Sequence, residues 1–551
     1  MEQPRSEEKF WPLAAAITLV VILTAAIRWS LAHPYGIHWD ESAYINEAWI
    51  DSHRLRYGML LRLGGRILLK SWGRPPAYRL LADPFLAVFG LCVTTARLVS
   101  LACFALSCWF IYLAARQIGS KTAGGFAALV FCLSPEVVSA SMFFGTDAPL
   151  YLAVSAMLYY LFASWGDEPN SARNWIGLGL AVGLGLLAKT SFVLIAFPAL
   201  LFWFVMGRRQ GSNAPTFATQ CKTGILALCI AAPWWLINIK DAFAYAQYAR
   251  GFVRVSLGSP SPATWLRWLN TVLQCLLGDG LSILIALVVV ACLIKVVVRK
   301  KLILDRLQTA SLGTCAFAGM PIVLAQLSGT NPLLRHITPA VIPLAIVVGV
   351  LADKTGWAHS FWGKAVSASL FCAQLLMLVT PVVLPNTHPL SLGFANGALP
   401  WRTMIRFDQW DWKPVQETSN ACGLASPKIA YLGGGRQFDP PAIQYPWVQA
   451  ATATRVAIFD LPDVTWLWRY EDGNLDWQNL MDSAARSDIV ITAPYYVGEK
   501  ENKEDLDNQY NAEFADRLLR DPRFQKPIHI EMGRFEPADV VVFTKKTLVC
   551  H

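Results

Sequence analysis

The sequence predicts a polytopic α-helical membrane protein with a C-terminal extracytoplasmic α/β domain. Of the 551 residues, 54% are hydrophobic and only 15% are charged, and the mean hydropathy is +0.39. Long apolar runs recur up to residue 384, whereas the remaining residues carry charges at the density of a soluble domain and contain no further span. We therefore expect a transmembrane domain at 1–384 and a soluble domain at 385–551.

About eleven apolar runs are long enough to form transmembrane helices. They lie near residues 11–31, 96–115, 122–139, 147–163, 175–189, 190–206, 222–239, 279–297, 309–327, 335–352 and 361–384. Basic residues such as Arg116, Lys121 and Lys354 fall in short loops on one side, which the positive-inside rule assigns to the cytoplasm. An odd number of spans then places the loop at 32–95, the loop at 240–278 and the C-terminal domain on the outer face of the cytoplasmic membrane.

The first outer loop carries basic residues where the positive-inside rule expects few. They are Arg54, Arg56, Arg62, Arg66, Lys70, Arg74 and Arg79. Any one of them is equally well explained as a side chain that extends toward the lipid head groups. Together they predict a surface that binds phosphate groups. Residues 42–54 and 75–89 are amphipathic and too short to span, so we expect two interfacial helices.

Two adjacent carboxylates, Asp40 and Glu41, follow the first span closely. A structural explanation is available, because Asp is a favoured helix N-cap and acidic residues suit the positive end of a helix dipole. A carboxylate at the edge of the hydrocarbon is costly, however, and is by default functional. Neighbouring residues on a helix point about 100° apart, so we expect Asp40 to face a site and Glu41 to support it.

Further candidate residues occur at the outer ends of later spans. Asp147 opens the fourth span and is also explained as an N-cap near Pro149. Lys189 ends the fifth span, and Arg335 with His336 opens the tenth; both cations are also explained as snorkelling side chains. Arg74 is held at a corner by the two prolines that follow it.

The order of these segments resembles the GT-C class of membrane glycosyltransferases, specifically the bacterial group that includes protein O-mannosyltransferases and the lipid A aminoarabinose transferase. The resemblance covers about residues 10 to 355. It is carried by Asp-Glu-Ser-Ala-Tyr at 40–44, Arg-Pro-Pro-Ala-Tyr at 74–78, Ala-Arg-Leu-Val-Ser at 96–100, Leu-Ser-Pro at 133–135, Thr-Asp-Ala at 146–148, the glycine-rich run to Lys-Thr at 183–190, and Arg-His-Ile-Thr-Pro at 335–339. Each motif is weak alone, but their order and spacing are fairly specific.

The resemblance implies an enzyme that transfers a sugar from a polyprenyl-phosphate donor to a lipid, glycan or protein acceptor. A carboxylate accepts the proton of the acceptor as the new bond forms, and fixed cations stabilise the departing phosphate. The implied residues are Asp40, Asp147 and Glu41 as catalytic residues, Arg74, Lys189, Arg335 and His336 as ligands of the donor phosphate, and Tyr44 and Tyr78 as residues lining the substrate.

Two positions depart from the aminoarabinose transferase pattern. Ala43 stands where that pattern has a cation, and Gly73 stands where it has an acid. The first change removes an expected phosphate ligand, and the second removes a metal ligand. We therefore expect neither a metal nor another cofactor, although Asp40, Glu41 and Asp147 could bind a cation weakly.

The C-terminal segment alternates predicted strands and helices, as in a small α/β domain. Strands are expected at 428–432, 455–459, 488–492 and 539–544, with helices at 475–486 and 511–519. The triple glycine at 433–435 lacks dinucleotide-binding spacing and is expected to form a turn. Trp466, Trp468 and Tyr470 fit packing better than sugar stacking, and Cys422 and Cys550 are available for a disulfide bond.

Two other classes of function remain open from the sequence. A lipid or glycan transporter would also have many spans, but its ionisable residues are expected nearer the middle of the membrane, on broken helices in paired halves. A membrane scaffold without catalytic activity would present the C-terminal domain to a partner and would tolerate Asp40→Asn.

Overall fold

The structure is a computed structural model that describes residues 9–34, 36, 39–69, 73–165, 169–209, 215–257, 282–299, 304–327, 337–383, 410–434, 438–454, 459–467, 476–497, 506–533 and 538–550. The chain divides into two compact units. The first consists of Met1–Ser30, Leu61–Leu81 and Arg97–Ile405, and the second of Leu31–Leu60, Ala82–Ala96 and Arg406–His551.

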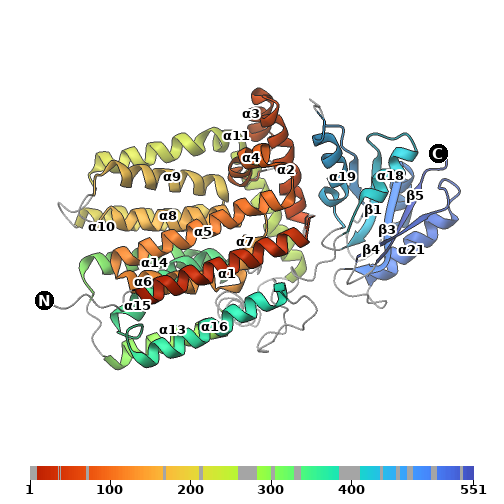
Figure 1. Ribbon diagram of the computed structural model, residues 1–551. Helices are drawn as coiled ribbons and strands as arrows, with labels where there is room; N and C mark the ends of the chain where they lie inside the picture. The colour runs from red at the N-terminus through yellow and green to blue at the C-terminus, as the bar shows by residue number, and fades with distance from the viewer. Residues whose placement is uncertain are drawn as a thin grey trace. The chain divides into compact units, whose positions relative to one another are not determined.

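The first unit is helical (Figure 1). Its elements are α1 (Phe10–Ala32), α3 (Leu60–Leu69), α5 (Val93–Ile118), α6 (Lys121–Cys132), α7 (Pro135–Met142), α8 (Asp147–Ala163), α9 (Ala172–Ala188), α10 (Phe192–Arg209), α11 (Phe217–Leu257), α13 (Ile283–Arg299), α14 (Arg306–Leu327), the 3-10 helix η5 (Thr338–Ala340), α15 (Val341–Lys354) and α16 (Phe361–Val383). Neighbouring pairs include α8 with α9, α9 with α11, α6 with α15 and α10 with α14. Every predicted span overlaps one of these helices.

In the described ranges, five helices are long and apolar enough to cross a membrane, and a sixth span is possible if α6 and α7 count as one. Four shorter apolar helices, α8, α9, α10 and α13, accompany them. This bundle is the helical membrane architecture that the composition predicts. The number of eleven spans stays a prediction.

Two predicted spans differ in shape from the structure. The run at 122–139 is bent by 67° between α6 and α7, because Pro135 starts a new helix after Ser134. The run at 222–239 is part of α11, which continues to Leu257. The first half of the predicted outer loop at 240–278 is therefore helical, and residues 258–278 lie outside the described part of the chain.

The first outer loop contains α2 (Trp39–Arg56), α3 and α4 (Ala77–Phe89). Helices α2 and α4 overlap the two predicted helices in sequence; their location at the membrane interface stays a prediction. Helix α3 was not predicted; its Leu61 is 95% exposed and it carries Arg62 and Arg66, which suits a helix lying at a membrane surface.

The C-terminal part of the second unit is built on a five-stranded sheet with strand order β2-β1-β3-β5-β4. The strands are β1 (Lys428–Gly434), β2 (Asp463–Trp466), β3 (Ile489–Val497), β4 (Ile528–Met532) and β5 (Ala538–Thr544). Strand β1 pairs in parallel with β2 and β3, whereas β5 pairs antiparallel with β3 and β4. Four helices accompany the sheet: α18 (Lys413–Ala421), α19 (Pro440–Thr452), α20 (Trp477–Ala485) and α21 (Leu506–Arg520).

Side chains alternate between the two faces of this sheet. Ile429 and Ile489 pack with α18 and α19 in one core, and Ala430 and Val490 pack with α20 and α21 in the other. Strand residues that alternate in direction can fill both cores, so the sheet is covered on both faces. The bond between Cys422 and Cys550 is present.

Several predicted details of this region are wrong or untestable. The strand β2 was not predicted. The predicted strand at 455–459 is untested, because 455–458 lie outside the described residues, although Phe459 itself is not in a strand. Gly433 and Gly434 belong to β1 instead of a turn, while Gly435 is not described. Trp466 is 47% exposed on an edge strand rather than packed, and Trp468 and Tyr470 lie outside the described residues.

Candidate functional site

The paired carboxylates lie in the first turn of α2. Asp40 is 2% exposed and Glu41 is fully buried. The N-terminal end of a helix carries partial positive charge, which makes the first turn a favourable position for acidic side chains. Tyr44, one turn further along α2, is also buried. All three predicted residues therefore share one short helical segment of the second unit.

Asp147 and Lys189 form an ion pair in the first unit. The Nζ atom of Lys189 lies 2.6 Å from Oδ1 of Asp147, and the side chains are 18% and 5% exposed. Thr146 occupies the N-cap position, so Asp147 is the first residue of α8 rather than its cap. Lys189 caps the C-terminal end of α9. The pair thus joins a positive helix end to a negative one with the charges that each dipole favours.

Arg74 and Tyr78 lie at the start of α4. The prolines after Arg74 lead into the helix, and the carbonyl oxygen of Pro76 accepts hydrogen bonds from the amides of Arg79 and Leu80 at 3.2 and 3.0 Å. The guanidinium carbon of Arg74 lies 5.6 Å from the ring centroid of Tyr245. Tyr78 is buried, with its ring 5.8 Å from that of Phe144.

The glycine before Arg74 has a backbone reason. Gly73 adopts a φ of +70°, and a Cβ atom there would lie 2.5 Å from the carbonyl oxygen of Asp241 in α11. The backbone therefore leaves no room for an acidic side chain at this position. Among the described residues, no group of three His, Cys, Asp or Glu side chains is arranged to hold a metal ion; the absence of a metal stays a prediction.

Arg335 and His336 lie outside the described residues, so their predicted role with the donor phosphate is untested. The described chain resumes at Ile337, just before η5. There the hydroxyl groups of Thr338 and Tyr151 lie 2.6 Å apart and share a hydrogen bond. This bond fixes the segment that follows the two basic residues against α8.

Arg97 belongs to a motif quoted above but was given no role. Its side chain is fully buried, and its guanidinium carbon lies 4.7 Å from the ring centroid of Trp29. A desolvated guanidinium over an indole face gains a cation–π interaction. The signal available in the sequence was its position: Arg97 is a cation at the start of an apolar run, directly after the outer loop.

Asp439 is a carboxylate that the sequence reasoning missed. It caps the N-terminus of α19, where its Oδ1 accepts a hydrogen bond from the amide of Ala442 at 2.9 Å. Its carboxyl has a pKa raised to about 8, mainly by burial and to a smaller extent by the nearby charge of Asp40. The Asp-Pro-Pro sequence at 439–441 signals a helix start, but nothing in the sequence connects that helix to α2.

Helix α2 packs against α19 within the second unit. Nδ2 of Asn46 donates a hydrogen bond to the carbonyl oxygen of Pro441 at 2.8 Å, and the rings of Trp49 and Tyr445 lie 5.1 Å apart. The first outer loop and the C-terminal sheet thus meet through these two helices. This contact joins segments from both sides of the domain boundary predicted between residues 384 and 385. That boundary stays a prediction.

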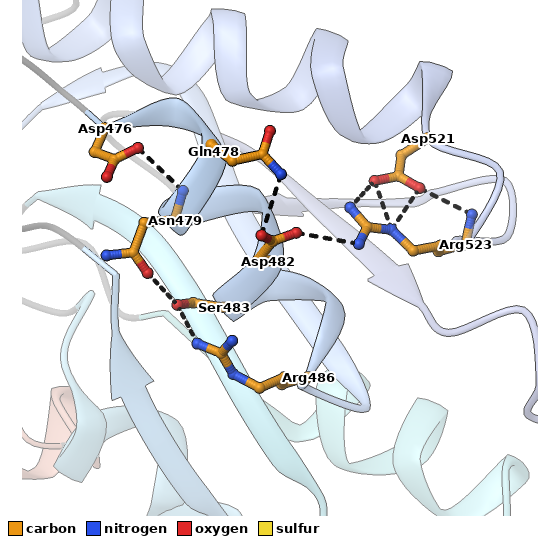
Figure 2. Close-up of polar contacts among 8 residues, drawn as sticks. All are labelled: Asp476, Gln478, Asn479, Asp482, Ser483, Arg486, Asp521 and Arg523. Carbon is orange, nitrogen blue, oxygen red and sulfur yellow. Dashed lines mark hydrogen bonds and ion pairs between the residues drawn. The ribbon is translucent and has the colours of Figure 1, made fainter.

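A shallow hollow of about 800 Å³ lies on the surface between α20 and α21. Two of its cations form ion pairs: Arg517 lies 2.6 Å from Glu513, and Arg523 lies 2.6 Å from Asp521. Figure 2 shows Arg523 between Asp521 and Asp482. Exposed ion pairs of this kind contribute about 0–1 kcal/mol, so we assign this surface to solvation of the domain.

Comparison with known proteins agrees with this architecture. A family model described as dolichyl-phosphate-mannose-protein mannosyltransferase matches residues 73–237. The undecaprenyl phosphate-alpha-4-amino-4-deoxy-L-arabinose arabinosyl transferase 1 of Proteus mirabilis is 26% identical over 188 residues, which are 32% of this chain and 34% of that protein. The aligned part therefore spans about a third of this curated relative.

Two solved structures share the fold over nearly the whole chain. ArnT from Cupriavidus metallidurans bound to undecaprenyl phosphate has a TM-score of 0.54 at 15% identity, covering 96% of this chain and 97% of ArnT. The apo form of ArnT gives 0.53 at 14% identity, covering 96% and 98%.

Together, the fold and the motifs resemble those of helical membrane proteins of the GT-C class. The particular group that the chain resembles is the one of the protein O-mannosyltransferases and ArnT, as the sequence motifs predict.

Proposed function

We propose that this protein is a glycosyltransferase that moves a sugar from a polyprenyl-phosphate donor to a lipid, glycan or protein acceptor on the outer face of the cytoplasmic membrane. The observation that carries the proposal is the burial of Asp40 and Glu41 in the first turn of α2. A buried carboxylate held at a helix N-terminus suits proton abstraction from an acceptor hydroxyl or amine. The group's relatives by name use prenyl-phosphate-linked sugars, which supports this donor.

In the proposed reaction, Asp40 accepts the proton of the acceptor as its oxygen or nitrogen bonds to the anomeric carbon. The bond between the anomeric carbon and the phosphate oxygen breaks, and polyprenyl phosphate departs with the electron pair of that bond. Glu41 supports Asp40, and Tyr44 and Tyr78 line the substrate. The charge of the leaving phosphate requires fixed cations, a role that we assign to Arg74, Lys189, Arg335 and His336. Asp147 orients Lys189 through the observed 2.6 Å contact.

The outer-face location is supported by the disulfide bond between Cys422 and Cys550. Disulfides persist in oxidising compartments and are rare in the cytosol. Both cysteines belong to the C-terminal region, which the charge pattern of the loops also assigns to the outside.

Transfer by the purified full-length protein tests the proposal. Radiolabelled undecaprenyl-phosphate pentoses and hexoses are supplied with a lipid and glycan extract, and labelled product is followed over time. We expect Asp40→Asn to lower the rate by about 10²–10⁴-fold, the usual contribution of general acid–base catalysis. Asp463→Asn, an exposed carboxylate of β2, serves as the control and should transfer at the wild-type rate. Wild-type transfer by Asp40→Asn would exclude Asp40 as the base, and movement of unmodified lipid without transfer would favour a transporter.

A further inference from the structure

The C-terminal sheet has the topology that creates a ligand-binding edge. The chain runs from β1 through α19 to β2 on one side, and then through α20 to β3 on the other side of β1. Helices α19 and α20 contribute to opposite core clusters, so they cover opposite faces. In sheets of this kind, ligands bind beyond the carboxyl ends of the parallel strands where the strand order reverses. That edge lies beyond the end of β1, before α19 begins.

Asp439 stands at this edge with half of its carboxyl group unused. Its Oδ1 caps α19, but its Oδ2 is buried and has no hydrogen-bond partner. The residue as a whole is 6% exposed. A buried polar atom without a partner costs about 1–3 kcal/mol, so its retention at a ligand-binding edge points to a partner that arrives from outside the chain.

Asn46 brings a second unused oxygen to the same helix end. Its Nδ2 is bonded to the carbonyl of Pro441, two residues after Asp439, whereas its Oδ1 is buried without a partner. Asn46 lies on α2, which also carries Asp40, and the charge of Asp40 acts on the Asp439 carboxyl. Two unpaired oxygens and the proposed catalytic carboxylate therefore share one neighbourhood within the second unit.

The capping role alone does not account for Asp439. Asp476 caps α20 in the same way, with Oδ1 accepting from the amide of Asn479 at 3.1 Å (Figure 2). Asp476 is exposed, so its second oxygen is free to bind water. Asp439 performs the same capping with its second oxygen removed from solvent.

We infer that Oδ2 of Asp439 and Oδ1 of Asn46 form a subsite that hydrogen-bonds the hydroxyl groups of a sugar beside Asp40. The inference rests on the proposed transferase function and assigns the C-terminal domain a part in substrate binding. Neighbouring sugar hydroxyls present the donors and acceptors that a carboxyl and an amide oxygen can satisfy together. The sugar belongs either to the polyprenyl-phosphate donor or to a glycan acceptor.

Kinetics of full-length Asp439→Ser test the inference. Serine keeps the N-cap but removes the second oxygen, and Asp476→Ser is the matched control. We expect the KM of one substrate to rise about tenfold or more, as for a lost hydrogen bond to a charged or buried group, with kcat changed less than about threefold. A rise in the donor KM places the donor sugar in the subsite, and a rise in the acceptor KM places the acceptor there. Unchanged KM values for both substrates would overturn the inference and leave the transferase proposal standing.

A binding measurement separates this subsite from catalysis. Saturation-transfer NMR with methyl pentosides and methyl hexosides reports sugar contact with the full-length protein without any transfer. We expect the signal to be lost in Asp439→Ser and in Asn46→Ala, and to be retained in Asp476→Ser, with thermal unfolding of each variant as the check on folding. Loss of binding together with absent transfer by the wild type would support the subsite while refuting the transferase; wild-type binding by both folded variants would refute the subsite.

Discussion

At the residue scale, the ion pair between Asp147 and Lys189 is the best-defined charge contact of the predicted site. Both side chains are largely buried, so removing either charge takes a close ionic contact away from a poorly solvated group. We expect Lys189→Gln and Asp147→Asn each to cost about 3–5 kcal/mol, and the double variant to cost less than the sum of the two. Thermal unfolding in detergent measures this coupling. Additive losses would show that the pair does not contribute to stability.

The same variants separate a structural lysine from a phosphate ligand. Asp147→Asn keeps the cation and loses its partner, whereas the double variant loses both charges. If Lys189 binds the donor phosphate, the double variant has a donor KM about tenfold above that of Asp147→Asn, because a charge-assisted hydrogen bond is lost. Equal donor KM values for Asp147→Asn and the double variant would exclude Lys189 as a phosphate ligand and leave it only as the ionic partner of Asp147.

The buried carboxyl of Asp439 makes stability depend on pH. Burial raises its pKa from 3.8 to about 8, so between these values the unfolded chain has released the proton that the folded protein still holds. The free energy of unfolding therefore falls as the pH rises through this window, by at most about 1.4 kcal/mol per unit. Asp439→Asn does not titrate. The difference between its melting temperature and that of the wild type should therefore increase in favour of the variant from pH 5 to pH 8. Parallel melting curves for the two proteins across that range would contradict the assigned pKa.

Candidate residues could be predicted from the sequence where a charged side chain stands at a position with a high energetic cost. Asp40 and Glu41 follow an apolar span directly, and a carboxylate is expensive there. Asp439 stands about 400 residues away in a capping sequence that is common in soluble domains. Its importance depends on the packing of α19 against α2, which no local pattern encodes.

At the element scale, the disulfide ties the end of α18 to the C-terminus. Cys422 caps α18 and bonds to Cys550, closing a loop over 128 residues that holds the whole sheet. Such a crosslink restricts the unfolded chain, which typically stabilises the folded state by about 2–4 kcal/mol. We expect the double variant Cys422→Ser/Cys550→Ser to have a lower unfolding temperature in the C-terminal region. Limited proteolysis during heating measures this temperature. Cys372→Ser, which removes an exposed free cysteine, is the control, and equal proteolysis of both variants would argue against this stabilisation.

Elements with strong periodicity were predictable, and those without it were not. Strands β1, β3 and β5 are apolar and buried, and their positions overlap the predicted strands. Helix α19 starts with Pro440 and Pro441, which suit a helix N-terminus, but it also contains Pro446, and a proline in a helix interior argues against a helix when it is read locally. The bend between α6 and α7 was hidden because both halves are apolar, and hydropathy alone does not register a change of direction.

At the scale of the whole molecule, the proposed outer position of the C-terminal domain is supported by two unrelated features. The basic residues Arg116, Lys121 and Lys354 assign their loops to the cytoplasm. The bond between Cys422 and Cys550 assigns its region to an oxidising compartment. The two assignments agree if α16, which lies between Lys354 and the C-terminal domain, crosses the membrane.

Enzyme fusions test this topology directly. Alkaline phosphatase requires its own disulfides, so it is active only when exported. We expect a fusion after residue 551 to be active and a fusion in the loop after Lys354 to be inactive, with fluorescence of a cytosolic reporter at the same two points giving the opposite pattern. Helix α16 lies between the two fusion points, so the two results must differ if that helix crosses the membrane. An inactive C-terminal phosphatase would place Asp439 in the cytoplasm, where it could not serve a site on the outer face, and would remove the basis for both the transferase proposal and the sugar subsite.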